Sequence, residues 1–142
     1  MPTPQIVLDT NVWIAARRSK HGASAQVVSL VGTGCFDLHL SVALVLEYEE
    51  VLMRQRHTLG LTNQDVDRLL DGICRIGIPH DISYLWRTHV RDPKDAHVLE
   101  LAVAASCDVI VTFNVRDFPE AHLFGIEVLK PRAFLHRIQP EA

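Results

Sequence analysis

Short apolar runs alternate along the chain with segments of helical periodicity. The run Val109-Ile110-Val111 is β-branched throughout, as is typical of a strand buried on both faces. The expected strands are residues 5–8, 36–40, 76–79, 109–112 and 126–129. The expected helices are residues 12–18, 23–31, 42–54, 64–75 and 93–106, with a last helix after Pro131. This alternation predicts an α/β fold with helices on both faces of a parallel sheet.

Helix start signals agree with this alternation. Ser41 precedes one helix as a candidate N-cap, and Thr62 with Asp65 resembles a capping box in which aspartate replaces the usual glutamate. Asp92 followed by Pro93 is typical of a cap with proline at the first helical position. These signals place the helices between the expected strands.

Composition narrows the class of protein. A chain of 142 residues predicts one domain, spanning residues 1–142, that is large enough to bury a core. The formal net charge of -3 provides no general attraction to nucleic acid or membrane, so such binding would need a local patch. Three scattered cysteines, no signal-length segment and no apolar run of transmembrane length lead us to expect a soluble cytoplasmic protein without membrane contact.

Acidic residues follow the expected strands. Right-handed crossovers place every strand-to-helix junction of a parallel sheet at one edge. Asp9 follows the first strand, and Glu47 lies about two helical turns after Ser41. Asp92 and Asp95 begin the helix after the third strand, and Asp117 follows the fourth. Carboxylates from four segments are therefore expected in one region.

Clustered carboxylates repel one another and favour a cation between them. Oxygen ligands without thiols suit Mg²⁺ or Mn²⁺, which activate water and polarise phosphate. The alternative is that each acid is a helix cap or a solvated surface group, and Asn11 is expected to be a cap rather than a ligand. Glu49 and Glu50 are expected on the solvated face of their helix, whereas the apolar neighbours of Glu47 indicate partial burial.

Four segments together resemble a known family of nucleases. They are Leu8-Asp9-Thr10-Asn11, Ser41 with Glu47-Tyr48-Glu49-Glu50-Val51-Leu52, Asp92-Pro93-Lys94-Asp95-Ala96-His97-Val98-Leu99, and Val111-Thr112-Phe113-Asn114-Val115-Arg116-Asp117-Phe118. In this order and spacing they resemble the PIN-domain nucleases, and among these the VapC-like toxins of toxin–antitoxin pairs. The resemblance covers nearly the whole chain.

The resemblance implies a three-layer α/β/α fold around a five-stranded parallel sheet. It implies Mg²⁺- or Mn²⁺-dependent cleavage of RNA, with catalytic and metal-binding acids at Asp9, Glu47, Asp95 and Asp117. It also implies a small antitoxin partner and a homodimer. One position departs from the family pattern, because Asn114 stands where an aspartate is common.

Other polar and aromatic residues are weighed against structural roles. Thr10, Asn114 and Arg116 are candidates for supporting the site, and Thr10 is equally suited to a turn. Trp13 and Trp86 are expected to be packing residues. The histidines lack metal-binding spacing, and His97 is expected to point away from Asp95 because two residues separate them on a helix.

Three alternatives to a toxin nuclease stay open. One is a housekeeping RNA-processing nuclease without an antitoxin, and another is a non-catalytic binding module with the same fold. The third is a phosphatase of the haloacid-dehalogenase type, which also begins with a strand and an aspartate. That family has a second aspartate two residues later, where this chain has Asn11, so this alternative is disfavoured.

Overall fold

The computed structural model describes residues 2–82 and 96–139. Strands and helices alternate in the first half as β1 (Gln5–Leu8), α1 (Thr10–Arg18), α2 (Ala23–Ser29), β2 (Asp37–Ser41), α3 (Val42–Gln55), α4 (Asn63–Ile76) and β3 (Ile78–His80). The second half contains α5 (Ala96–Ala104), β4 (Val109–Val111), the 3-10 turns η3 (Val115–Asp117) and η4 (Ala121–Phe124), β5 (Glu127–Leu129) and α6 (Pro131–Ile138).

The sheet has five parallel strands in the order β3-β2-β1-β4-β5. β1 occupies the centre, where Ile6 pairs with Leu38 on one side and with Val109 on the other. The apolar side chains of β1 and β4 are buried, as the apolar runs predict for a sheet covered on both faces. The expected α/β class with a five-stranded parallel sheet is therefore confirmed.

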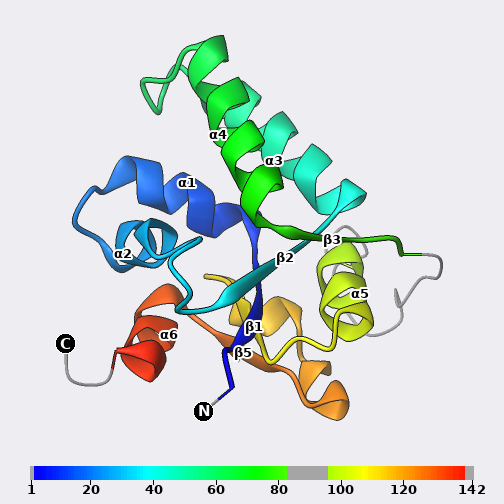
Figure 1. Ribbon diagram of the computed structural model, residues 1–142. Helices are drawn as coiled ribbons and strands as arrows, with labels where there is room; N and C mark the ends of the chain where they lie inside the picture. The colour runs from blue at the N-terminus through cyan, green and yellow to red at the C-terminus, as the bar shows by residue number, and fades with distance from the viewer. Residues whose placement is uncertain (1, 83–95, 140–142) are drawn as a thin grey trace.

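Helices form a layer on each side of this sheet. Figure 1 shows α5 on the opposite side of β1 from α1, α2 and α6. α1 packs on α2, and α2 packs on α6, whereas α5 contacts β1, β2 and β4. α3 and α4 pack against each other and extend away from the sheet (Figure 1). Because β1 leads directly into α1 and β2 into α3, the first turns of both helices lie at the same edge of the sheet.

Most expected boundaries agree with the structure to within a few residues. Ser41 caps α3 by accepting a hydrogen bond from the Leu44 N–H at 3.2 Å, and Thr62 and Asp65 form the complete capping box. The expected cap of Asp92 and Pro93 lies outside the described residues. The expectation that Ile76 begins a strand is wrong, because α4 continues through it.

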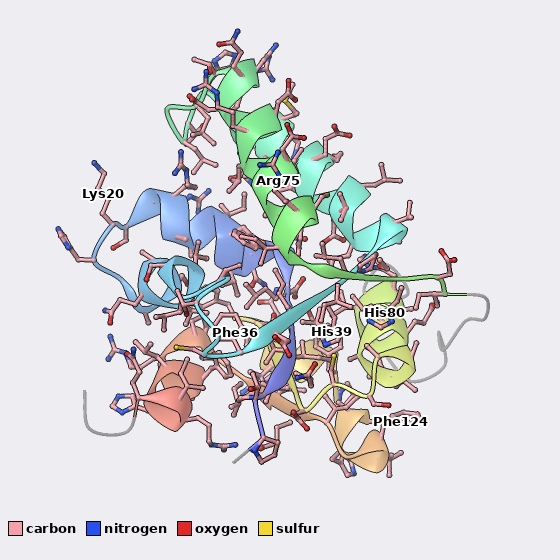
Figure 2. All side chains as sticks on the ribbon, in the orientation of Figure 1. Lys20, Phe36, His39, Arg75, His80 and Phe124 are labelled. Carbon is pink, nitrogen blue, oxygen red and sulfur yellow. The ribbon has the colours of Figure 1, made fainter. Side chains whose placement is uncertain are left out.

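A polar contact chain joins β1, β2 and β3. His39 is buried, with its Nδ1 2.7 Å from His80 Nε2 and its Nε2 2.6 Å from Gln5 Oε1. Figure 2 labels the two histidines, which lie beside each other. Burial, together with the neighbouring His80, lowers the pKa of His39. A neutral ring that accepts from His80 and donates to Gln5 satisfies both contacts, so the pair stabilises the edge strand.

No helix in the described part of the chain combines the length and apolar character that crossing a membrane requires.

Gly77 gives a test of how α4 connects to β3. A Cβ atom at this position would lie 2.3 Å from Leu40 Cδ1 and 3.0 Å from the Ile73 carbonyl oxygen. Leu40 is buried in β2, so its side chain must repack. Gly77→Ala should therefore lower the free energy of unfolding by about 1–3 kcal/mol in urea denaturation. Gly72→Ala is the control, because a Cβ there meets nothing within 4 Å and alanine favours the helix; equal effects would contradict this assignment.

Candidate active site

Asp9 lies at the end of the central strand. Its N–H donates to the Val111 carbonyl at 2.9 Å, which extends the ladder of β1 and β4 by one residue. Its side chain is buried, with Oδ1 accepting from the Thr10 N–H and Oδ2 accepting from the Thr112 hydroxyl, both at 2.8 Å. Asp9 is thus the N-cap of α1 and, at the same time, a buried acid at the carboxyl edge of the sheet.

Thr112 organises the loop after β4 around Asp9. Its Oγ1 donates to Asp9 and accepts from the Asn11 amide at 3.2 Å and from the Asn114 N–H at 3.0 Å. Asn11 also accepts from the Phe113 N–H at 3.2 Å. The expectation that Asn11 is a helix cap is therefore wrong: it lies inside α1 and joins that helix to the β4 loop.

Glu47 comes to Asp9 from α3. Its Oε2 accepts a hydrogen bond from the Thr10 hydroxyl, and its Oε1 lies 3.0 Å from His97 Nε2 of α5. Thr10, one of the supporting candidates, therefore contacts both acids, because its N–H donates to Asp9 and its hydroxyl donates to Glu47. His97 belongs to this cluster, which corrects the interpretation that set it aside from the site. Its other ring nitrogen, Nδ1, is buried and has no hydrogen-bond partner among the described residues.

Tyr48 fixes the position of α3 relative to β1. Its hydroxyl donates to the carbonyl of Leu8, the residue before Asp9, and its side chain is completely buried. Its ring packs edge-on against Trp13, with the ring centroids 5.8 Å apart. Trp13 is thus a packing residue, as expected, and Tyr48 holds the adjacent Glu47 close to Asp9.

The two carboxyls have opposite electrostatic environments. Burial raises the pKa of Asp9, and the nearby Glu47 charge acts in the same direction, although the bonds from Thr112 and Thr10 oppose them. Burial alone would also raise the pKa of Glu47, but hydrogen bonds from His97 and Thr10 and the charge of His97 lower it overall. The charged form of Asp9 therefore lowers the stability of the folded state.

An open cavity of about 510 Å³ lies beside Asp9, and Glu47 is not part of its lining. Its lining comes from α1, α3 and the β4 loop: Asp9, Thr10, Asn11, Ile14, Ala15, Arg18, Val51, Gln55, Phe113 and Asn114. Because Asp9 lines this cavity, the buried carboxylate is accessible to a ligand from solvent. Its volume falls within the range of about 300–1,000 Å³ that is typical of ligand sites in proteins.

The remaining sequence candidates differ in position. Asn114 lines the cavity, whereas Asp117 and Arg116 lie on η3. In the described part of the chain, no hydrogen bond or ion pair joins these two residues to Asp9 or Glu47. Asp95 lies outside the described residues. Glu49 and Glu50 are exposed, as expected.

The donor set of the site suits a hard cation. Within residues 2–82 and 96–139, no group of three or more histidine, cysteine or acidic side chains is arranged to hold a metal ion. Asp9 and Glu47 nevertheless offer carboxylate oxygens that interact electrostatically, and burial disfavours the charged form of Asp9. A divalent cation with oxygen ligands would relieve both effects, so the residues present fit such an ion.

Comparison with known proteins identifies the family. The PIN domain family model matches residues 5–116, so this chain belongs to the PIN domain family. No curated protein sequence matches the chain.

Solved structures share the fold at low sequence identity. A chain in the structure of VapBC-1 from nontypeable Haemophilus influenzae matches with a TM-score of 0.62 and 15% identity, covering 90% of this chain and 98% of that one. A chain of VapBC2 from Rickettsia felis, bound to a promoter DNA fragment, matches with a TM-score of 0.59 and 12% identity, covering 89% and 98%. A chain of FitAcB from Neisseria gonorrhoeae matches with a TM-score of 0.54 and 21% identity, with coverages of 89% and 98%.

The burial of Asp9 predicts a pH dependence of stability in EDTA. Because its pKa is raised above the ordinary 3.8, the folded state holds the proton more tightly than the unfolded state. The free energy of unfolding of the wild type therefore falls as pH rises from about 3.8 through the raised pKa of Asp9, because the buried carboxyl becomes charged. Asp9→Asn cannot ionise at this position, so it should lack this decrease. Urea denaturation should show the variant gaining stability relative to wild type between about pH 4 and pH 7.

Glu49→Gln, which changes an exposed acid on α3, is the matched control for this measurement and should show a smaller change. A stability difference between Asp9→Asn and wild type that stays constant with pH would contradict the assignment of Asp9 as a strained buried carboxylate.

Proposed function

We propose that this protein is a metal-dependent endoribonuclease that hydrolyses RNA phosphodiester bonds. The observation that carries the proposal is the pair of carboxylates, Asp9 and Glu47, which both accept a hydrogen bond from Thr10, with Asp9 lining an open cavity. Membership in the PIN domain family supports a nuclease, and RNA as the substrate rests on the resemblance to VapC-like proteins.

Asp9 and Glu47 would hold Mg²⁺ or Mn²⁺ together with Asp95, which the family pattern makes the third acid. Such an ion supplies an activated water and a positive charge on the phosphate when it is bound. Thr112 and Thr10 contribute by fixing the direction of the two carboxylates, since each hydroxyl donates to one of them. No serine or cysteine nucleophile is needed for this chemistry.

The roles of residues in the fourth family segment, Val111 to Phe118, are also proposals. Asp117 would add a further acid, and Asn114 would contribute its side-chain carbonyl where related proteins have a carboxylate. Arg116, which is exposed beside them, would contact a substrate phosphate. Such a contact positions the RNA strand without selecting its nucleotide sequence.

The proposed biological role is that of the toxin of a toxin–antitoxin pair. The structures that share this fold include complexes named VapBC and FitAcB, which favours a small antitoxin partner and a homodimer here. A basic side chain of the antitoxin would neutralise the acidic pair in place of the metal. Co-purification from the native operon distinguishes this role from that of a housekeeping nuclease, which would lack such a partner.

Cleavage of defined RNAs with Mg²⁺ or Mn²⁺ tests the proposal. Asp9→Asn should reduce cleavage by about a thousandfold or more because it removes a charged ligand of the metal, whereas Glu49→Gln should leave cleavage unchanged. EDTA should abolish the wild-type activity. Full activity in excess EDTA, or in folded Asp9→Asn protein free of wild type, would overturn the proposal.

The cleavage assay, together with urea denaturation, distinguishes the roles of the two neighbouring acids Asp92 and Asp95. Asp95→Ala should abolish cleavage, since the family pattern makes it the metal ligand. Asp92→Ala should retain it but lower the free energy of unfolding by about 0.5–2 kcal/mol, as a lost helix cap does. A stable but inactive Asp92→Ala protein would reassign the third acid.

A further inference from the structure

An exposed aromatic ring borders the cavity that Asp9 lines. Phe113 is 42% exposed and is the aromatic member of the large exposed hydrophobic residues in the described part of the chain. Phenylalanine is usually buried in the core, where its apolar surface stabilises the fold. Here the ring lines the cavity together with Asp9 and Asn114. Its position therefore suggests contact with a ligand.

The backbone that carries this ring is firmly held. The Phe113 N–H donates to Asn11 of α1 at 3.2 Å. On its two sides, the Thr112 hydroxyl donates to Asp9, and the Asn114 N–H donates back to Thr112. The same hydrogen-bond network thus positions the exposed ring and the buried carboxylate. A ligand group that packs on Phe113 would be placed beside Asp9 without reorganisation of the loop.

A positively charged side chain, that of Arg18, lines the same cavity as this ring. Arg18 is in the last turn of α1 and lines the cavity, and its NH2 donates at 2.8 Å to the neutral amide of Gln55 in α3. That contact orients the guanidinium without neutralising it. Thr10 and Arg18 are eight residues apart on one helix, so about 12 Å of axis separates them. This span exceeds the rise of one stacked nucleotide, which is about 3.4 Å.

Building on the proposed nuclease function, we propose that Phe113 is a base-stacking platform that selects an unpaired nucleotide beside the scissile bond, with Arg18 binding the backbone of the same strand. A base inside a duplex already stacks on its neighbours, so it must leave the helix before it can cover this ring. The favoured substrate is therefore single-stranded RNA or an RNA loop. Every base has a flat apolar face, so the ring imposes little sequence preference.

An antitoxin segment is a competing occupant of this cavity. Ile14, Ala15 and Val51 are part of its lining and offer apolar surface to a peptide. The observations favour RNA as the ligand of Phe113. The Phe113 backbone shares one polar network with Asp9, and Arg18, which forms no ion pair with an acid in residues 2–82 and 96–139, lines the same cavity. A role limited to the antitoxin is one of the outcomes of the test.

The stacking test uses RNA that carries 2-aminopurine, whose fluorescence is quenched by stacking. Binding of a single-stranded oligonucleotide to the full chain is measured in EDTA, so that turnover does not interfere. Phe113→Ala should weaken binding by about 5- to 150-fold and remove the quenching that the wild type causes. Phe113→Trp should restore both. Leu123→Ala is the matched control, since Leu123 is an exposed apolar residue that does not line the cavity.

Arg18 is tested by the salt dependence of the same binding. Arg18→Gln should reduce the slope of log affinity against log salt concentration by about 0.7, the value for one phosphate contact on a single strand. Arg17→Gln, on the same helix but outside the cavity lining, should leave the slope unchanged. An unchanged slope in Arg18→Gln would overturn the backbone contact.

Cleavage by wild-type protein distinguishes failure of this inference from failure of the proposed function. Wild type with Mn²⁺ should cut an unpaired site faster than the same sequence in a duplex, and Phe113→Ala should lose much of this preference. If wild type cleaves RNA but Phe113→Ala matches it in binding, quenching and preference, the stacking role is wrong and the nuclease stands. If Phe113→Ala loses affinity only for a co-purified antitoxin, the ring serves the antitoxin. If wild type binds with quenching but never cleaves, the proposed function fails instead.

Discussion

Burial of the Asp9 carboxylate at the end of the central strand is the constraint on which the rest of the site depends. A charged group in this position is costly unless hydrogen bonds or a cation compensate it. The Thr10 N–H and the Thr112 hydroxyl each supply one bond, and they come from α1 and from the end of β4. The acid therefore joins three elements at the carboxyl edge of the sheet, where ligands bind in open α/β folds.

The surrounding contacts extend this arrangement to the second acid. Tyr48 ties α3 to the carbonyl before Asp9, and Glu47, its neighbour in the chain, reaches Thr10 and His97. Glu47 is stabilised in its charged form, whereas Asp9 is not. Such a pair lowers the stability of the folded protein but forms a site for a cation before the ion binds. Functional sites commonly lower stability in this way.

Much of this could be predicted from the sequence, because parallel strands and amphipathic helices leave strong local patterns. The apolar run before Asp9 marked β1 correctly, and chain order placed Asp9 and Glu47 at one edge. Contacts between distant elements left no such pattern: Thr112 looked like a strand end, and His97 gave no sign that it would reach Glu47 across α3 and α5. Asn11 suited a cap, but Asp9 is the cap and leaves Asn11 free to hold the β4 loop. The roles of Asp95 and Asp117 stay predictions.

If Asp9 and Glu47 together form a site for a divalent cation, Mn²⁺ binding must depend on both carboxylates, and electron paramagnetic resonance measures that binding. Wild type should bind Mn²⁺, Asp9→Asn and Glu47→Gln should each weaken binding by about tenfold or more, and Glu49→Gln should leave it unchanged. Equal affinity of all four proteins for Mn²⁺ would contradict this dependence.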